Sequence, residues 1–429
     1  MRKRLLFAFS MLLGTMLLSM GCEEKKQPSE EKADSTKVVK EKETKTVQLK
    51  PIRPTTATLF IDASASMKGY LDSGAPEFPG VISAFANYAS NTDRWFWGKG
   101  KIGKTTQSKD TVPYSKTEFD DMLSNRSIPW AQESNLITVI REMQDCNKNI
   151  SILVTDGILS GSNEQINKSP NRGYNIQQRE AMSNELSKTL QSKEQSALIV
   201  RYMSKFTGVY SCYNNDTVKM TNQERPFFVI VIGEWKYVKY LEDELKKEKE
   251  KEKNKNISTV YENIYMIGDK DSYDTIHFYP GDEFENHEDK LRIKKEYKEI
   301  GKIVTLRADI RVLPDYMQKE SWLKSHLILL VNNEPITPKA VKYDSVKTRL
   351  EISIDAGDLL CGTEDCTIDV RLKFDSPNWI DNVSDDDDLD IRNKIDERTK
   401  TFNLIYFIKG FEVLNREYVK EQSIEISKY

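Results

Sequence analysis

The sequence predicts a doubly wound α/β domain with a mostly parallel sheet, followed by a β-rich, sandwich-like C-terminal domain. In the first part of the chain, short apolar runs alternate with stretches of helical periodicity, which is the pattern of a sheet covered by helices on both faces. After about residue 300 the hydrophobic period shifts towards two, as in strands with one buried face. The chain has 429 residues, of which 38% are hydrophobic, and this length favours two domains with sizeable cores.

The first 21 residues have the layout of a secretory signal peptide. Three basic residues precede an apolar run, Leu5 to Met20, which ends in Gly21-Cys22. The stretch Leu-Ser-Met-Gly-Cys at 18–22 resembles a lipobox, in which a signal peptidase cleaves before a diacylated cysteine, so we expect a lipid on Cys22. An uncleaved anchor and a plain secretory signal are the alternatives, but the run is shorter than the roughly 20 apolar residues that span a bilayer. The segment predicts a lipid-anchored protein of the bacterial cell envelope, with the outer membrane as its expected location.

Residues 22–50 follow as the lipidated cysteine and a charged tether. Between residues 23 and 50 there are seven acids, eight lysines and no aromatic residue, a composition too polar to bury and typical of a flexible linker. Glu23-Glu24 fit a surface-export tag and the start of this linker equally well, so the face of the membrane stays open.

The charge balance excludes a nucleic-acid-binding role. Lys and Arg total 64, Asp and Glu total 67, and the formal net charge of −3 becomes −6 when the three basic residues of the signal are removed. We find no basic face with interleaved aromatic residues, which binding to a phosphate backbone requires.

The predicted α/β domain covers residues 51–270. Its expected strands lie at 58–61, 94–97, 150–155, 197–203 and 227–232, and its expected helices at 81–89, 136–143, 177–190 and 237–245. The run KKEKEKEK at 246–253 is interpreted as the solvated end of the last helix, with a partner-binding charge strip as the alternative.

The predicted β-rich domain covers residues 300–429. Strands are expected at 303–312, 326–331, 350–354, 367–374 and 402–408, separated by turns rich in Pro, Gly, Asn and Asp. An acidic loop at 385–388 could hold calcium through carboxylate oxygens, but it lacks the ordered spacing and the glycine of an EF-hand loop, so a solvated loop is favoured.

Four cysteines remain besides the one in the signal region. Cys361 and Cys366 flank a turn-like stretch between two strand-like runs, so a small disulfide loop is expected in an oxidising envelope. Cys146 and Cys212 have no evident partner. Buried thiols are the simpler interpretation for these two, and a long-range bridge is the alternative.

Potential metal ligands gather at the end of the first predicted strand. The sequence Phe-Ile-Asp-Ala-Ser-Ala-Ser-Met at 60–67 places Asp62, Ser64 and Ser66 at alternate positions of a strand-to-helix turn. Side chains at such positions can converge on one point, and in open α/β sheets such sites lie beyond the carboxyl ends of the strands. One carboxylate and two hydroxyls are hard oxygen ligands that suit Mg²⁺ and leave positions for waters and an incoming acidic group.

The apolar strand expected at 150–155 also ends in an aspartate, Asp156. With these motifs the chain resembles the von Willebrand factor A (vWA) family, whose metal-ion-dependent adhesion site (MIDAS) combines Asp-x-Ser-x-Ser with a distant Thr and an Asp after a hydrophobic strand. The resemblance covers about residues 56–268 and implies a vWA/Rossmann-like fold. It says nothing about the C-terminal third.

The resemblance assigns metal ligands residue by residue. The implied ligands are Asp62, Ser64, Ser66, Ser134 and Asp156. Ser134 stands just before a predicted helix, where the family usually has Thr, and serine keeps the hydroxyl. Thr138 is the fallback, although it would lie inside that helix.

Binding without turnover is the function that the resemblance implies. In the family a Glu or Asp of another protein completes the shell of the cation, so we expect Mg²⁺, or else Mn²⁺ or Ca²⁺, and a protein partner with an acidic residue. Catalysis has little support, because the three histidines are not at metal-binding spacing and there is no nucleophile elbow or Walker loop. The alternative is an envelope enzyme whose α/β domain recruits substrate for clustered acids of the C-terminal third: Asp355, Asp358, Glu364 and Asp365.

Overall fold

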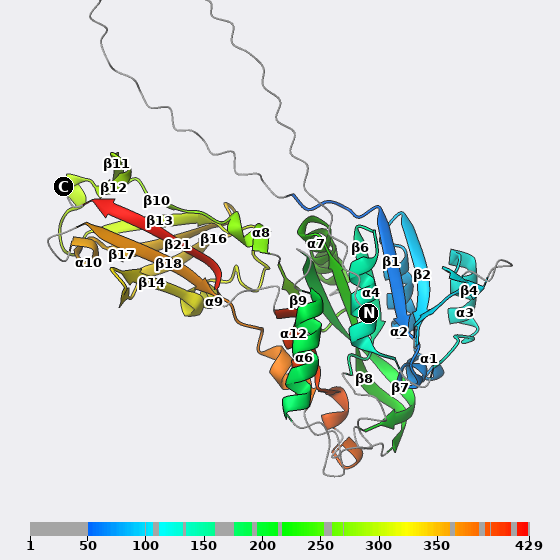
Figure 1. Ribbon diagram of the computed structural model, residues 1–429. Coiled ribbons are helices and arrows are strands. Elements are labelled where there is room, and N and C mark those ends of the chain that lie inside the picture. Colours follow the sequence, from blue (N-terminus) through cyan, green and yellow to red (C-terminus); the bar gives the residue numbers. More distant parts are fainter. Residues whose placement is uncertain are drawn as a thin grey trace, which may run out of the picture. The chain divides into compact units, whose positions relative to one another are not determined.

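A computed structural model describes most of the chain from residue 50 onwards (Figure 1). The described residues are 50–98, 100–105, 111–131, 134–158, 176–190, 195–212, 217–252, 260–268, 270–360, 365–385, 391–394, 396–412 and 418–427. They belong to one compact unit, Val47–Tyr429. Within these ranges, no helix is both long and apolar enough to cross a membrane. The expected signal peptide, Cys22 and nearly all of the tether lie outside the described residues.

A seven-stranded sheet organises the N-terminal part of this unit. In spatial order its strands are β3 (Lys101–Ile102), β2 (Asn91–Trp97), β1 (Thr56–Asp62), β6 (Ile150–Thr155), β8 (Thr217–Gly233), β7 (Ser196–Ser211) and β9 (Asn263–Ile267). β1 pairs in parallel with β2 and β6, whereas β3, β8, β7 and β9 join in antiparallel pairs. The sheet is therefore mixed, and the expectation of a mostly parallel sheet is wrong.

The long hairpin of β7 and β8 explains this difference. The strands expected at 197–203 and 227–232 leave enough chain between them for the crossover of a dozen or more residues that a parallel pair needs. In the structure both strands extend towards each other, so that Ser211 pairs with Thr217 and only a short connection remains. Strands joined by so short a connection pair antiparallel.

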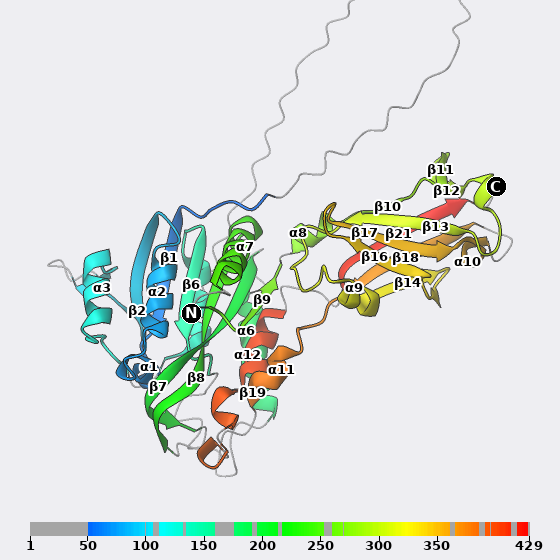
Figure 2. The same ribbon diagram turned by 180° about the vertical axis from the view of Figure 1, so that it is seen from behind.

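Helices cover both faces of the sheet. The helices of this part are α1 (Lys68–Asp72), α2 (Glu77–Ala86), α3 (Lys116–Ser124), α4 (Leu136–Asp145), α6 (Ile176–Leu190) and α7 (Trp235–Glu252). The short helix α8 (Lys270–Asp274) contacts β21 (Tyr418–Ser427) instead. Side chains alternate along β6, so that Ile152 packs in the hydrophobic cluster that contains α2 and α7, and Leu153 packs in the cluster that contains α4 and α6. Figures 1 and 2 show the sheet and these helices from opposite sides.

The run expected as a strand at 402–408 forms a helix instead. Only Thr401–Phe402 (β20) is extended, and α12 follows at Leu404–Phe411. The apolar residues of α12 recur at helical spacing and are buried in the cluster of α4 and α6: Leu404, Phe407, Ile408 and Phe411. A short apolar run fits a strand or a buried helix equally well by period alone, so packing against α6 decides between them.

Two further sheets form the β-rich part of the chain. In spatial order the first contains β10 (Phe278–Pro280), β13 (Ile303–Asp309), β17 (Arg349–Asp355) and β16 (Ala340–Asp344). The second contains β11 (Phe284–His287), β12 (Lys290–Ile293), β21 (Tyr418–Ser427), β18 (Cys366–Lys373), β14 (Leu327–Val331) and β15 (Glu334–Ile336). Burial alternates residue by residue along β13, β17 and β18, so each of these strands has one buried face, as its period of two predicts.

Short elements complete the described chain. They are β4 (Lys104–Thr105), β5 (Thr111–Val112), β19 (Ser384–Asp385), α9 (Glu320–His326), α10 (Ala356–Leu360) and α11 (Trp379–Val383), with the 3₁₀ turns Ala65–Met67, Lys295–Tyr297 and Asp396–Thr399.

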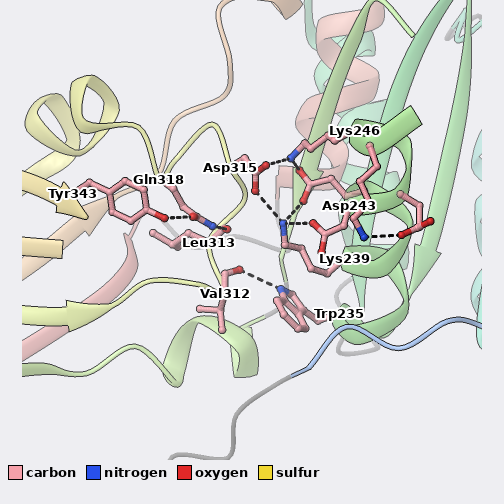
Figure 3. A network of polar contacts seen from close by, with 12 residues as sticks. Trp235, Lys239, Asp243, Lys246, Val312, Leu313, Asp315, Gln318 and Tyr343 are labelled. Carbon is pink, nitrogen blue, oxygen red and sulfur yellow. Dashed lines mark hydrogen bonds and ion pairs between the residues drawn. The ribbon is translucent and has the colours of Figure 1, made fainter. Parts of the chain in front are cut away.

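An ion-pair network joins α7 to the segment between β13 and α9 (Figure 3). The ammonium of Lys239 lies 2.7 Å from Glu242 and 3.0 Å from Asp315, and that of Lys246 lies 2.6 Å from each of the same two carboxylates. Burial alone would lower the pKa of Lys239, but the facing carboxylates of Glu242, Asp315 and Asp243 raise it. Because Lys239 and Glu242 are both buried, each depends on the other for compensation of its charge.

Candidate metal site

The two aspartates singled out in the sequence lie at the same edge of the sheet. β1 and β6 are parallel neighbours, with Ile61 paired to Val154. Asp62 is the last residue of β1, and Asp156 comes directly after β6. The parallel register therefore brings both carboxylates to the carboxyl ends of adjacent strands, the usual place of a ligand site in an open α/β sheet.

The turn after β1 gathers two hydroxyls beside the carboxylate of Asp62. The backbone N–H of Ser64 donates to Asp62 Oδ1 over 2.9 Å, and the hydroxyl oxygens of Ser64 and Ser66 lie 3.0 Å apart. Met67, which is fully buried, fixes the far end of the turn by donating its N–H to the carbonyl of Ser64. The alternate spacing thus folds into a compact set of oxygens.

Ser134 reaches the same point from a third segment. The carbonyl of Ala63 accepts the N–H of Ala131 over 2.7 Å, which holds the chain before α4 against the turn. The hydroxyl of Ser134 forms a hydrogen bond with the carboxylate of Asp62. The fallback ligand, Thr138, lies in the first turn of α4, where its N–H is capped by the side chain of Asn135.

Thr155 is a member of the site that the sequence interpretation missed. Its hydroxyl donates to Asp62 Oδ2 over 2.8 Å and accepts the N–H of Gly157 over 3.2 Å. The side chain is fully buried, so it orients Asp62 from behind. The signal available in the sequence was the polar Thr155 at the end of the apolar run Ile-Leu-Val, directly before Asp156.

The two carboxylates oppose each other electrostatically. Burial raises the pKa of Asp62. Burial and the charge of Asp62 together raise the pKa of Asp156 to about 6, although hydrogen bonds from Ser66 and the N–H of Ile158 act in the other direction. Asp62 is 2% exposed and Asp156 5% exposed, so solvent does little to screen the repulsion, and a bound dication would relieve it.

These residues fit a divalent cation. Two carboxylates and three hydroxyls offer hard oxygen atoms only, which is the donor set of Mg²⁺, Mn²⁺ or Ca²⁺ rather than of zinc. The five residues of this set offer oxygen atoms and no nitrogen or sulfur ligand: Asp62, Ser64, Ser66, Ser134 and Asp156.

A second acidic cluster has a different character. Oxygen atoms of Glu242, Asp243 and Asp315 lie within 4.8 Å of one another. However, these carboxylates are already paired with the ammonium groups of Lys239 and Lys246 (Figure 3). A cation entering there would have to displace two lysines, so the cluster is better described as a structural ion-pair network.

The acids proposed for a rival enzyme site have structural contacts. Asp355 accepts the N–H groups of Gly301 and Gly357 at 3.0 and 2.8 Å, which lowers its pKa. Asp365 pairs with Lys290 at 3.0 Å. These contacts indicate turn and surface roles. Of the other two acids, Asp358 lies in α10, and Glu364 lies outside the described residues.

The cysteines are partly described. Cys361 lies outside the described residues, so its disulfide with Cys366 stays a prediction. Cys366 is buried at the start of β18, with its Sγ 3.3 Å from the carbonyl oxygen of Leu359. Cys146 is a free thiol, so the alternative of a bridge between it and Cys212 is not formed. Most of the acidic loop at 385–388 also lies outside the described residues.

Comparison of the chain with protein-family models, curated proteins and solved structures finds no match. The assignment of function therefore rests on the residues themselves.

Proposed function

We propose that the protein is a cell-envelope lipoprotein that binds a protein partner through a divalent cation in a vWA-like domain. A MIDAS-like site would hold the cation through Asp62, Ser64, Ser66, Ser134 and Asp156. Mg²⁺ suits this set of hard oxygens best, with Mn²⁺ or Ca²⁺ as alternatives. The lipid on Cys22 would anchor the chain in the membrane, and the charged tether would give the folded unit its reach.

The observation that carries this proposal is the convergence of oxygens from three separate segments. The turn after β1, the chain before α4 and the end of β6 all meet at the carboxylate of Asp62 or beside it. Two buried carboxylates at one point are unfavourable in the absence of a cation. Electrostatic repulsion between buried carboxylates at the edge of a sheet is typical of a ligand site rather than of a hydrophobic core.

The cation would supply a positive charge to which an acidic side chain of the partner binds. Ser66 and Ser134 are half-buried, whereas the two carboxylates are almost inaccessible. The partner would therefore approach from the side of the hydroxyls, and its carboxylate would replace a water in the cation's shell.

Titration calorimetry of the purified full chain with MgCl₂ or MnCl₂ tests the metal site. The wild type should bind one equivalent, and Asp62→Ala should lose at least about 100-fold in affinity because a negatively charged ligand that contacts the cation is removed. Ser134→Ala should lose less, since water can replace a single neutral ligand.

Asp72→Ala is the matched control. Asp72 lies on α1, close after the site in sequence, and pairs with the exposed Lys68 at 4.0 Å. Its removal should leave cation affinity and circular dichroism unchanged. A wild type that binds no cation at millimolar concentration, or Asp62→Ala binding as tightly as wild type, rules out the metal site.

Capture of envelope proteins on the immobilised chain tests the binding function. Partner recovery should depend on Mg²⁺, disappear in EDTA, and be absent for Asp62→Ala but normal for Asp72→Ala. Recovery that is the same with and without EDTA contradicts a metal-dependent partner site.

A further inference from the structure

A buried arginine lies close behind the proposed metal site. Arg225, in β8, is 1% exposed, and its guanidinium carbon lies 4.3 Å from the ring centroid of Tyr210. Its Nη1 donates to the carbonyl oxygen of Arg398 over 3.2 Å, and it forms a hydrogen bond with the side chain of Tyr70. All three partners are neutral groups, and among the described residues Arg225 has no carboxylate at ion-pair distance.

The strand register places this arginine next to Asp156. β6 and β8 are antiparallel, and their pairing ends with Thr155 opposite Phe228. Continued by one residue beyond the end of β6, this register brings Asp156 level with Phe227, and Arg225 lies two residues further along on the same face as Phe227. Diagonal neighbours of this kind have Cβ atoms within about 7–8 Å of one another, which is within reach of a long side chain.

Tyr70 confirms that these groups share one buried region. It lies on α1, just after the turn of the proposed site, and its hydroxyl donates to the carbonyl of Pro226, the residue after Arg225. The pKa of Tyr70 is raised by burial, while the charge of Arg225 lowers it and the charges of Asp156 and Asp62 raise it again. The charge of Arg225 likewise lowers the pKa of Asp156.

A buried guanidinium needs compensation, because arginine stays protonated in proteins and desolvation of a charge is unfavourable. Asp156 and Asp62 are the negative groups that its surroundings provide. We propose that Arg225 is the internal counter-cation of the Asp62–Asp156 pair and holds the affinity of the site for a divalent cation low. This inference rests on the proposed metal site and concerns its regulation.

The net charge of the buried site changes with each ligand that binds. The two carboxylates and Arg225 sum to −1, and a bound dication changes this to +1, which is again an uncompensated buried charge. A carboxylate from the partner brings the sum to zero. The arginine therefore favours the complex of cation and acidic partner over the cation alone, so that metal and partner bind with positive coupling.

Two substitutions separate the charge of Arg225 from its shape. Arg225→Met keeps most of the volume and removes the charge, and Arg225→Lys keeps the charge. With Mn²⁺ alone as the titrant, Arg225→Met should bind at least about tenfold more tightly than wild type, since repulsion between the arginine and the dication is lost. Arg225→Lys should stay within about threefold of wild type.

A double-mutant cycle in EDTA gives a readout that loss of packing alone does not change. Asp156→Asn should raise the thermal unfolding midpoint more in the Arg225→Met background than in wild type, because no attraction to the arginine is lost there. If Arg225→Met does not fold, Arg225→Gln is used in its place.

The possible failures are distinguishable. A wild type that binds no Mn²⁺ overturns the proposed function. Binding of Mn²⁺ by wild type and Arg225→Met with equal affinity, or equal effects of Asp156→Asn in both backgrounds, overturns the role of Arg225 and leaves the metal site intact.

Discussion

Replacement of Asp156 by asparagine should stabilise the metal-free protein while it removes metal binding. Asn keeps the shape of the side chain and an oxygen that can accept the N–H of Ile158, which now donates to Asp156 Oδ1 over 3.1 Å. The substitution removes the negative charge that burial and Asp62 make unfavourable. Replacement of one carboxylate oxygen by an amide NH₂ group should therefore both stabilise the metal-free protein and abolish metal binding.

The size of the gain follows from the pKa of Asp156. The pKa is about 6 in the folded protein against 3.8 for an unperturbed aspartate, and one pKa unit corresponds to about 1.4 kcal/mol. Above about pH 7 the ionised side chain thus lowers the free energy of unfolding by about 3 kcal/mol, which asparagine avoids. If Val47–Tyr429 unfolds as one cooperative unit, this corresponds to a rise of about 4 °C in the unfolding midpoint.

The sign of the pH dependence provides a second check. An acid whose pKa is raised on folding is protonated more in the folded state, so stability is lost as pH rises from the unfolded pKa to the folded one, here from about 4 to about 6. The difference between Asp156→Asn and wild type should therefore vanish near pH 4 and reach its full size near pH 7.

Differential scanning calorimetry in EDTA and in Mg²⁺, at several pH values, measures both effects. In EDTA the variant should be the more stable protein at neutral pH. In saturating Mg²⁺ only the wild type should gain stability, as expected for a ligand that binds the folded state. A variant that is less stable than wild type at neutral pH in EDTA, or a difference that does not change with pH, would refute the reasoning.

Three further predictions concern other parts of the chain. Cys22→Ser should release the protein from detergent-extracted membranes and remove its acyl chains on mass spectrometry; membrane partition that persists with acyl chains excludes the lipid anchor. Alkylation of the unreduced, denatured chain should leave Cys361 and Cys366 unlabelled, and labelling of both excludes their disulfide. Glu242→Ala should lower the free energy of unfolding in urea by on the order of 3 kcal/mol, because the buried Lys239 loses the one of its carboxylate partners that is itself buried. Asp243→Ala, in the same network but more exposed, should lower it by less than about 1 kcal/mol.

Much of the candidate site could be predicted from the sequence because its parts are local. Asp62, Ser64 and Ser66 are adjacent in one turn, and the apolar strands before Asp62 and Asp156 predict that both aspartates lie at strand ends. Two parallel neighbours then bring those ends together. Ser134 was implied by the resemblance to the vWA family, and in the structure its side chain forms a hydrogen bond with Asp62.

Other features depended on contacts between segments that are distant in the sequence. The antiparallel hairpin of β7 and β8 pairs Ser196 with Gly233, two residues that are far apart in the sequence. The run at 402–408 became the helix α12 because α6 offers an apolar surface for it. Period and propensity are weak where a segment is short, so burial against a partner decides.

By itself, then, the sequence determined which residues are predicted as ligands of the candidate site, since their spacing and the strands that end in aspartate are properties of short segments. Only the tertiary structure decided the electrostatics of the site. The pKa of Asp156 depends on burial and on Asp62, and Arg225 becomes its neighbour only through the register of β6 and β8. The energy of a charge depends on the surrounding medium and on the distance to every other charge near it. A linear sequence specifies neither the medium nor these distances.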